Sequence, residues 1–245
     1  MATHPGVERL PVDELPARQG DDVCVIVPMY NEAAVITDVV SCLAQAFETV
    51  ICVDDGSHDG TAELAAKAGA TVVHHPVNLG QGAALQTGVE FGLRSPARYF
   101  VTFDADGQHQ VTDALAMLER LRRGDLDIVL GSRFLEAGAD IPRVRRMVLR
   151  AAVTFTRATT RLTLTDTHNG LRVMTRSTAR LLQLRLSGMA HASEILDVVA
   201  RHRLTYEEMP ISIMYSDYSR AKGQSSLNAV NVLIDLILAR LRVIR

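Results

Sequence analysis

The sequence is poor in cysteine, in aromatic side chains and in long hydrophobic runs. It has three cysteines and no tryptophan among 245 residues, and aromatic residues make up only 4%. Cys24, Cys42 and Cys52 stand in apolar surroundings, are odd in number and lack C-x-x-C spacing. This pattern disfavours a disulfide framework or a zinc site. It predicts reduced, buried thiols, as in a cytoplasmic protein.

Two further absences narrow the class of protein. No uninterrupted apolar run reaches the ~18 residues of a membrane-spanning helix. Residues 1–22 carry three prolines among charges and no signal-peptide core, so we expect a loosely ordered lead-in. The formal net charge of -2 lacks the basicity with which proteins grip nucleic acid along their length. We therefore expect no nucleic-acid partner.

Short β-branched runs alternate with helical stretches in the first half of the chain. Nearly all-apolar strands separated by helices predict an α/β fold whose parallel sheet is covered on both faces. We expect one domain over residues 23–245, with a first half at 23–130 and a second at 131–245. Ser57 or Asp59 is expected to cap the second helix, and Thr112 the fourth. The expected strands are 23–27, 50–53, 71–73, 99–103 and 127–130, and the expected helices are 32–46, 61–68, 81–93 and 112–123.

Polar segments follow four of the expected strands. Ligands of open α/β sheets bind beyond the carboxyl ends of the strands, so chemistry is expected there. Each segment alone is weak evidence for a ligand site, but their occurrence after four strands supports one. The segments are Pro28-Met29-Tyr30-Asn31-Glu32, Asp54-Asp55-Gly56-Ser57, Asn78-Leu79-Gly80-Gln81-Gly82 and Asp104-Ala105-Asp106-Gly107-Gln108.

Asp104 and Asp106 form a D-x-D pair directly after a strand, followed by the side-chain amide of Gln108. Oxygen ligands in this pattern suit a hard divalent cation that keeps room for phosphate oxygens, so Mg²⁺ or Mn²⁺ is expected. The alternative is that the two aspartates cap a helix or form an Asx turn.

The other segments suggest contacts to a nucleotide. Gly80 and Gly82 open a helix and permit close approach of a diphosphate to the helix N-terminus. Tyr30 offers a flat face to a base, and a carboxylate of Asp54 or Asp55 could accept a base N–H. Tight turns with no ligand are the alternative explanation for these glycines and aspartates.

Taken in order, the motifs resemble family 2 glycosyltransferases of the GT-A fold, and more narrowly the dolichyl-phosphate or polyprenyl-phosphate glycosyl synthases. The resemblance covers residue 23 to about residue 233. It implies a single Rossmann-like, mixed but mainly parallel sheet with amphipathic helices on the acceptor side. The first half would bind the nucleotide sugar and the second half the acceptor. Besides the four segments, it rests on Gly131-Ser132-Arg133, Asp166 to Gly170, and Arg220 to Ser225.

The resemblance also implies roles for single residues. Asp106 and Gln108 are the expected direct metal ligands, with Asp104 bound directly or through water. Arg133 is expected to face a lipid phosphate, and Arg220, with Lys222, to lie near the donor diphosphate. Pro28, Tyr30, Glu32, Val53 and Asp55 are expected to contact the nucleoside, and Asp104, Ala105, Asp106 and Gln108 to line the ribose, diphosphate and metal.

Two positions depart from the family pattern. Ser226 replaces the lysine that ends an R-x-x-G-x-S-K motif in the mannosyl synthases, and Lys222 could supply that charge from a different position. Asn169 replaces a serine before Gly170. The sugar and the nucleotide are therefore left open.

Arginine is concentrated in the second half. Residues 133–185 contain eleven arginines against three acids, which favours an anionic partner there. Five of them, Arg143, Arg146, Arg150, Arg157 and Arg161, have the spacing of one helical stripe, which would suit lipid phosphate or a membrane surface. A solvated charged face is the alternative.

The C-terminal segment 227–245 is apolar nearly all round and ends in arginines, so we expect an amphipathic helix. It would lie in the membrane interface, contact a separate membrane subunit, or pack on its own domain.

These observations predict an inverting, metal-dependent transfer of a sugar from a UDP- or GDP-linked donor to a polyprenyl phosphate. The enzyme would be cytoplasmic and peripheral on the inner face of the membrane. A lipid phosphate is already an anion, so little general-base help is needed. A carbohydrate acceptor would need a base, for which Asp166 or Glu194 would be the candidates. A silent nucleotide-sugar sensor that binds a membrane partner is a further alternative.

Overall fold

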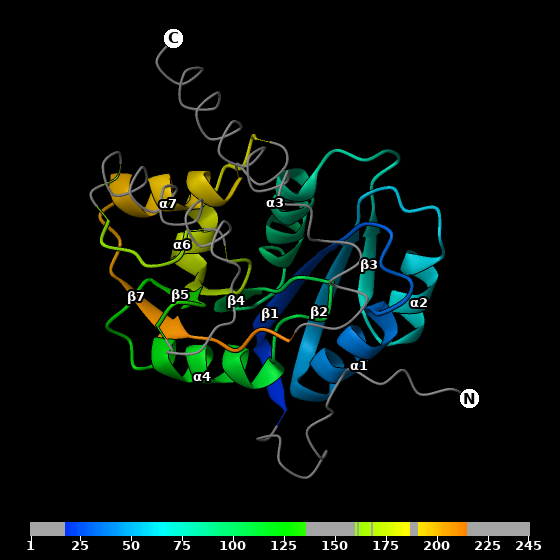
Figure 1. The fold of residues 1–245 in the computed structure, drawn as a ribbon, viewed down its shortest axis with the longest axis horizontal. Helices are drawn as coiled ribbons and strands as arrows, with labels where there is room; N and C mark the ends of the chain where they lie inside the picture. The colour runs from blue at the N-terminus through cyan, green and yellow to red at the C-terminus, as the bar shows by residue number, and fades with distance from the viewer. Residues whose placement is uncertain (1–17, 136–159, 161, 168, 187–190, 215–245) are drawn as a thin grey trace.

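The computed structural model describes residues 18–135, 160, 162–167, 169–186 and 191–214 of the chain. Its centre is a seven-stranded sheet in the order β3-β2-β1-β4-β6-β5-β7 (Figure 1). Six of these strands run parallel, and β6 runs antiparallel between β4 and β5. The strands are β1 (Gln19–Met29), β2 (Phe47–Asp54), β3 (Thr71–His74), β4 (Tyr99–Thr102), β5 (Ile128–Ser132), β6 (Arg172–Thr175) and β7 (Tyr206–Pro210).

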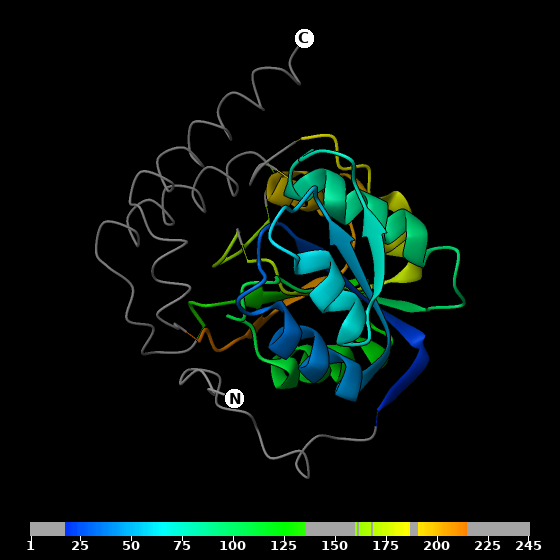
Figure 2. The ribbon, with the colours of Figure 1, turned by 90° about the vertical axis from the view of Figure 1, so that its right-hand side faces the viewer.

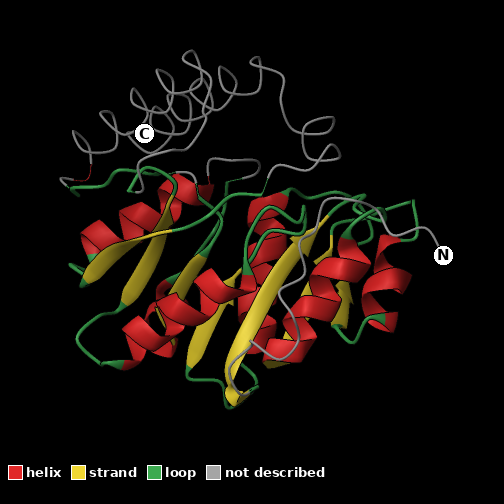
Figure 3. Ribbon diagram, turned by 60° about the horizontal axis from the view of Figure 1, so that its bottom comes forward, coloured by secondary structure: helices red, strands yellow, loops and turns green. Residues whose placement is uncertain are grey.

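Helices cover both faces of the sheet (Figures 2 and 3). Hydrophobic residues of α1, α2 and α4 pack on one face, and those of α3, α6 and α7 pack on the other. The prediction of a mixed, mainly parallel α/β sheet with helices on both faces is confirmed. The helices are α1 (Ile36–Ala46), α2 (Thr61–Lys67), α3 (Gln81–Gly92), α4 (Val111–Arg122), α6 (Arg176–Leu181) and α7 (His191–Arg201).

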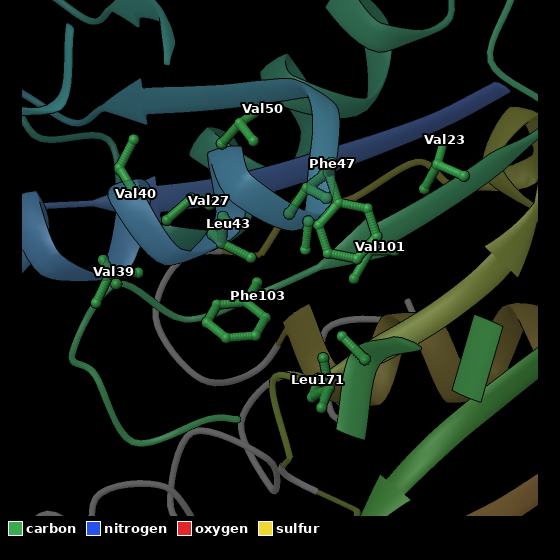
Figure 4. Close-up of a cluster of buried hydrophobic side chains, with 14 of the residues drawn as sticks. Val23, Val27, Val39, Val40, Leu43, Phe47, Val50, Val101, Phe103 and Leu171 are labelled. Carbon is green, nitrogen blue, oxygen red and sulfur yellow. The ribbon is translucent and has the colours of Figure 1, made fainter. Parts of the chain in front are cut away.

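The alternation of side chains along β1 explains why both faces must be covered. Val23, Val25 and Val27 belong to one buried cluster, and Cys24 and Ile26 belong to the other. Successive residues of a strand point to opposite faces, so an all-apolar strand needs an apolar layer on each side. Figure 4 shows the first cluster, in which side chains from β1, α1 and β4 meet. The buried state predicted for Cys24 and Cys52 is also confirmed, while Cys42 is only half-buried.

Three local predictions were wrong. The first helix begins at Ile36 rather than at residue 32, because Asn31 has a positive φ of 53° and residues 32–35 form a turn. Gly60, in the left-handed region, occupies the cap position of α2, although Asp59 Oδ1 still accepts the Thr61 N–H at 3.1 Å. Gln110, not Thr112, precedes α4, and its side chain makes no cap hydrogen bond.

The second half of the chain contributes to the same sheet as the first half. Strands β6 and β7 and helices α6 and α7 were not predicted from the sequence. An arginine opens β6, and two glutamates lie in β7, so neither strand reads as a buried apolar run. The five arginines of the predicted helical stripe and the predicted C-terminal helix 227–245 lie outside the described residues, as does the lead-in up to residue 17.

Candidate active site

The segments that follow the strands meet at the carboxyl edge of the sheet. Strands β1, β2 and β4 run parallel and end at Met29, Asp54 and Thr102, so their following loops leave from the same edge. The Asp55 N–H donates to Met29 O at 2.9 Å, and the Phe103 N–H donates to Ile26 O at 2.9 Å. The predicted gathering of these segments beyond the strand ends is therefore present.

The loops after β1 and β2 are joined by side-chain hydrogen bonds. The Asn31 N–H donates to Ser57 Oγ at 2.9 Å, and the Glu32 N–H donates to Thr61 Oγ1 at 2.8 Å. Tyr30, next to this seam, exposes 41% of its surface, so its ring is accessible to a flat ligand.

Pro28 and Val53, by contrast, are buried in the strands below. A nucleoside contact from either residue would therefore come from its backbone.

Asp55 fixes the loop that leads into α3. One carboxylate oxygen accepts the Leu79 N–H at 2.9 Å, and the other accepts the Gly80 N–H at 2.7 Å. His75 Nδ1 lies 2.8 Å from the first oxygen, and His75 Nε2 lies 2.9 Å from Thr87 Oγ1. Asp55 is buried in this network, so its direct role here is to hold the loop backbone.

The two positions at the start of α3 require glycine for different structural reasons. Gly80 has φ 94° and ψ 156°, a conformation that L side chains rarely adopt, and it sets the entry into the helix. Gly82 is buried, and a Cβ there would overlap Leu186 O and would lie 2.9 Å from His191 Cβ. Gly82 therefore admits the segment before α7, whereas the sequence suggested close approach of a diphosphate.

The Asp104 side chain is surrounded by polar side chains. Its carboxylate accepts a hydrogen bond from Gln81 Nε2 at 3.1 Å and lies 3.0 Å from His109 Nε2. Gly170, shortly before β6, packs closely against Asp104, and a Cβ at Gly170 would overlap the Asp104 carboxylate. Burial by itself raises the pKa of Asp104, but His109, with Arg172 and His191, outweighs burial and holds that pKa below its ordinary value.

Asp106 has the opposite character. Burial and the neighbouring charge of Asp104 raise its pKa to about 6, and Glu32 adds to the repulsion. One carboxylate oxygen accepts the Gln108 N–H at 3.0 Å. The two aspartates therefore differ: Asp104 is held ionised by its neighbours, and Asp106 carries an ionisation cost that a bound cation would relieve.

The side chains near Asp106 could supply only some of the ligands of a divalent cation. Among the described residues, no group of three His, Cys, Asp or Glu side chains is arranged to hold a metal ion. Asp106, with Asp104 and the Gln108 amide nearby in sequence, offers oxygen ligands of the kind that Mg²⁺ and Mn²⁺ prefer. Such ions commonly take one or two carboxylates and complete their shell with phosphate oxygens and water. The residues present fit that arrangement.

Arg133, at the end of β5, is held by Asp166. Its Nε and NH2 lie 2.7 and 2.8 Å from the two carboxylate oxygens, a bidentate pair. The Asp166 side chain has no exposed surface. Glu208 of β7 holds the same segment by accepting the Thr165 and Asp166 N–H groups at 2.8 and 3.0 Å.

Five residues of this edge were missed or given a minor role by the sequence analysis. His109 was interpreted only as a polar lining of the cleft, and His191, Gln81 and Arg172 had no assigned role. Gly170 was noted for its motif and not for its contact with Asp104. Of these, His109 and Gln81 lie inside the motifs and could have been found there, whereas Arg172 and His191 come from elements that the sequence did not predict.

The remaining predicted residues are not part of this described edge. Arg220 and Lys222 are outside the described residues, as is His168. Glu194, a candidate base, accepts the Arg185 and Leu186 N–H groups at 3.0 and 2.9 Å. Its carboxylate serves the segment before α7.

Comparison with solved structures identifies the class of fold to which this sheet belongs. Glucosyl-3-phosphoglycerate synthase of M. tuberculosis superposes with a TM-score of 0.67 at 20% identity, over 94% of this chain and 84% of its own. Its complex with Mn²⁺ and UDP-glucose gives 0.62 at 20% identity, over 96% of this chain and 84% of its own. The mixed sheet is thus the GT-A fold of glycosyltransferases.

The sequence model of glycosyl transferase family 2 matches residues 24–181, well over half of the chain. The chain belongs to this family of glycosyltransferases. An undecaprenyl-phosphate mannosyltransferase of Micrococcus luteus is 30% identical over 82% of this chain and 86% of its own length. A UDP-N-acetylglucosamine–dolichyl-phosphate N-acetylglucosaminyltransferase of Methanococcus voltae is 27% identical over 89% and 96%. The predicted resemblance is confirmed.

Proposed function

We propose that the chain is an inverting, metal-dependent enzyme that transfers a sugar from a UDP- or GDP-linked donor to a polyprenyl phosphate. One observation carries the proposal: the aspartate pair after β4 and the Arg133–Asp166 pair after β5 flank β6 at one edge of the sheet. The first pair suits a metal-bound diphosphate, and the second presents a cation to a phosphate. The relatives named for undecaprenyl and dolichyl phosphates favour this acceptor.

On the donor side, Asp55 and Gly80 set the loop that would receive the nucleotide, and Tyr30 would stack on the base. Asp106 and Gln108 would hold Mg²⁺ or Mn²⁺, with Asp104 adjacent. When bound, the metal stabilises negative charge on the departing nucleoside diphosphate. The neighbour with Mn²⁺ and UDP-glucose in its title supports a divalent ion here.

On the acceptor side, Arg133 would orient the lipid phosphate. A phosphate oxygen then attacks the anomeric carbon as the bond from that carbon to the diphosphate oxygen breaks, which inverts the anomeric centre. No proton needs to move, because the nucleophile is an anion and the leaving diphosphate is stabilised in place. Arg220 and Lys222 would add positive charge beside the diphosphate.

The candidate bases argue against a sugar hydroxyl as the acceptor. Asp166 is bound by Arg133 through both carboxylate oxygens, and Glu194 accepts two backbone N–H groups. Protonation of either carboxylate would weaken the hydrogen bonds that it accepts in this structure, which disfavours both as general bases. An anionic acceptor needs no such base.

The enzyme would work at the inner face of the membrane, where the acceptor lipid is held. No helix among the described residues has the length and hydropathy to cross a bilayer. The arginine-rich sequence between residues 133 and 185 would attract anionic headgroups.

The test is an incubation of the protein with Mn²⁺, a panel of UDP- and GDP-sugars and a short polyprenyl phosphate, with products read by mass spectrometry. We expect one donor to give a prenyl phosphate carrying one sugar. Asp106→Asn serves as the inactive control, and Asp125→Asn, an exposed carboxylate paired with Arg120, serves as the active one. A sugar attached to a glycan hydroxyl, or donor binding without metal or turnover, would reject the proposal.

A further inference from the structure

Strand β6 brings one arginine between the two halves of the proposed active site. Arg172 lies opposite Thr102 of β4 and opposite Leu130 of β5 in the sheet register. Asp104 follows two residues after Thr102, and Arg133 follows three residues after Leu130. Because β6 is inserted between these strands, Arg172 stands between the end of the donor strand and the end of the acceptor strand.

The side chain of Arg172 is directed to the face of the sheet that α3 and α7 cover. Directly opposed residues of neighbouring strands share a face, and Leu130 and Met174, two residues along β6, belong to the cluster on that face. His191, the first residue of α7, is buried on this face and interacts with Asp104. Arg172 is therefore enclosed by protein on this face of the sheet.

Arg172 is a buried cation that is attracted to two carboxylates, Asp104 and Asp166. It is only 3% exposed, and its NH1 atom makes no hydrogen bond to any described residue. Burial lowers its pKa to about 10, and attraction to Asp104 and Asp166 opposes that shift. It therefore stays charged at neutral pH. A buried guanidinium is costly unless anions compensate it, and attraction to these two carboxylates offsets part of that cost.

Both carboxylates are in turn tied to the chemistry. Asp104 is confined by Gln81 and His109 beside Asp106, and Asp166 binds Arg133 through two hydrogen bonds. A chain of alternating charges thus runs Asp104, Arg172, Asp166, Arg133 from the donor side to the acceptor side.

We propose that Arg172 is a positioning residue that couples the metal-binding aspartates to the acceptor arginine by sharing its charge between Asp104 and Asp166. The inference rests on the proposed function. In this arrangement the positive charge of Arg172 weakens the negative potential around the aspartate pair and attracts Asp166, which also binds Arg133. Loss of Asp166 would turn the whole charge of Arg172 toward Asp104, and loss of Arg172 would leave Asp104 uncompensated.

These two changes should alter metal affinity in opposite directions. Arg172→Gln removes a positive charge near the aspartates, so Mn²⁺ should bind about fivefold more tightly, while transfer falls through kcat because Asp166 loses a neighbouring charge that helps to position it and Arg133. Asp166→Asn removes a negative charge and releases Arg172, so Mn²⁺ should bind about fivefold more weakly. A residue that only supports the fold would weaken Mn²⁺ binding in both variants.

The experiment is a Mn²⁺ titration followed by electron paramagnetic resonance, with the full chain alone and with UDP or GDP. Arg176→Gln is the matched control, since Arg176 follows β6 directly and donates to the Leu93, Ser95 and Ala97 carbonyls away from the aspartates. We expect it to lower Tm and leave the Mn²⁺ affinity unchanged.

The outcomes separate the coupling from the function. Equal Mn²⁺ affinity in wild type, Arg172→Gln and Asp166→Asn, or a weakening in both variants, overturns the role of Arg172. If Arg172→Gln does not fold, an unchanged Mn²⁺ affinity in Asp166→Asn is by itself enough to overturn the role of Arg172. A wild-type protein that binds no Mn²⁺ rejects the proposed function itself. Mn²⁺ binding without transfer to prenyl phosphate rejects only the acceptor.

Discussion

Two aspartates separated by one residue have opposite electrostatic settings. Asp104 is held ionised by His109, Arg172 and His191, whereas burial and Asp104 itself raise the pKa of Asp106 to about 6. Ionisation of Asp106 is unfavourable in the free protein because of burial and the charge of Asp104. A bound cation would reduce this unfavourable electrostatic energy.

The raised pKa of Asp106 gives a prediction with a definite sign. The folded protein holds this proton up to about pH 6 and the unfolded chain releases it near 3.8, so the contribution to stability is lost as pH rises from about 4 to 6. Asp106→Asn has no such loss. In EDTA we expect it to be more stable than wild type at pH 7.5, by roughly 2 kcal/mol, with the difference shrinking toward pH 4.

Thermal denaturation of both proteins across this pH range measures the effect. The same variant should lose sugar transfer by about 10³-fold, since the expected ligand is gone. A wild-type protein as stable as the variant at pH 7.5 would contradict the raised pKa. Full activity of the variant would contradict the metal assignment.

Gly170 is expected to be intolerant of any side chain. The Cβ of Gly170→Ala would overlap the Asp104 carboxylate, which Gln81 and His109 hold from the other sides. We expect transfer to fall about 100-fold as Asp104 is displaced, with a loss of about 1–3 kcal/mol in stability. The assay is kcat together with urea denaturation. Gly20→Ala, whose new Cβ would have 3.9 Å to its nearest neighbour, should match wild type in both.

At the scale of elements, the site depends on segments that reach the sheet edge from distant parts of the sequence. The loop before α3 is held by Asp55, and the start of α3 receives the segment that leads to α7. Strand β6 separates β4 from β5 and carries Arg172. The edge is therefore assembled from both halves of the chain, so a change in one element is expected to be felt in the others.

Gly82 tests this dependence. Gly82→Ala places a methyl group against Leu186 O and His191 Cβ, and backbone cannot yield as a flexible side chain does. We expect a loss of about 1–3 kcal/mol in stability. Activity should also fall, because His191 contributes to the electrostatic environment of Asp104 and would be displaced.

Urea denaturation and the transfer assay measure these two effects of Gly82→Ala. Ala84→Gly, at a buried position one half-turn along the same helix, is a useful comparison, since it weakens α3 without adding volume. If Gly82→Ala were as active as wild type, the packing of the α7 segment on α3 would not matter for the site.

At the scale of the whole molecule, charge is divided unevenly along the chain. The formal net charge is only -2, yet residues 133–185 hold eleven arginines against three acids. Several described arginines of that stretch have structural partners: Arg133 binds Asp166, and Arg176 binds carbonyls at the end of α3. The arginines between residues 143 and 157 lie outside the described residues, so their membrane role stays a prediction.

That role predicts binding to vesicles of anionic lipid. Co-sedimentation with phosphatidylglycerol vesicles should exceed that with phosphatidylcholine and should fall as salt rises, because surface charges are screened. Reversal of Arg143, Arg146 and Arg150 to glutamate should abolish the difference between the two lipids. Binding that is insensitive to lipid charge and to this triple change would favour an apolar or protein contact instead.

Local sequence patterns were enough to predict five of the seven strands of the described sheet and to mark candidate donor-side residues. Apolar runs at β1, β2, β3, β4 and β5, and the polar residues after β1, β2 and β4, need no distant information, because strand burial and loop chemistry are local properties. The five strands predicted from these patterns and their four helices are all present, with ends shifted by a few residues. Asp104, Asp106 and Asp55 were marked as candidate site residues for the same reason.

Tertiary structure alone decided the partners of those residues. Nothing local indicates that β6 would insert antiparallel between β4 and β5, since strand pairing is set by packing across many intervening residues. The contact of Gly170 with Asp104, the place of Arg172 between two carboxylates, and the packing of Gly82 against the segment before α7 all follow from that insertion and from helix docking. Ionisable residue types can be read from the sequence, whereas the fold sets which of them meet and how readily each ionises.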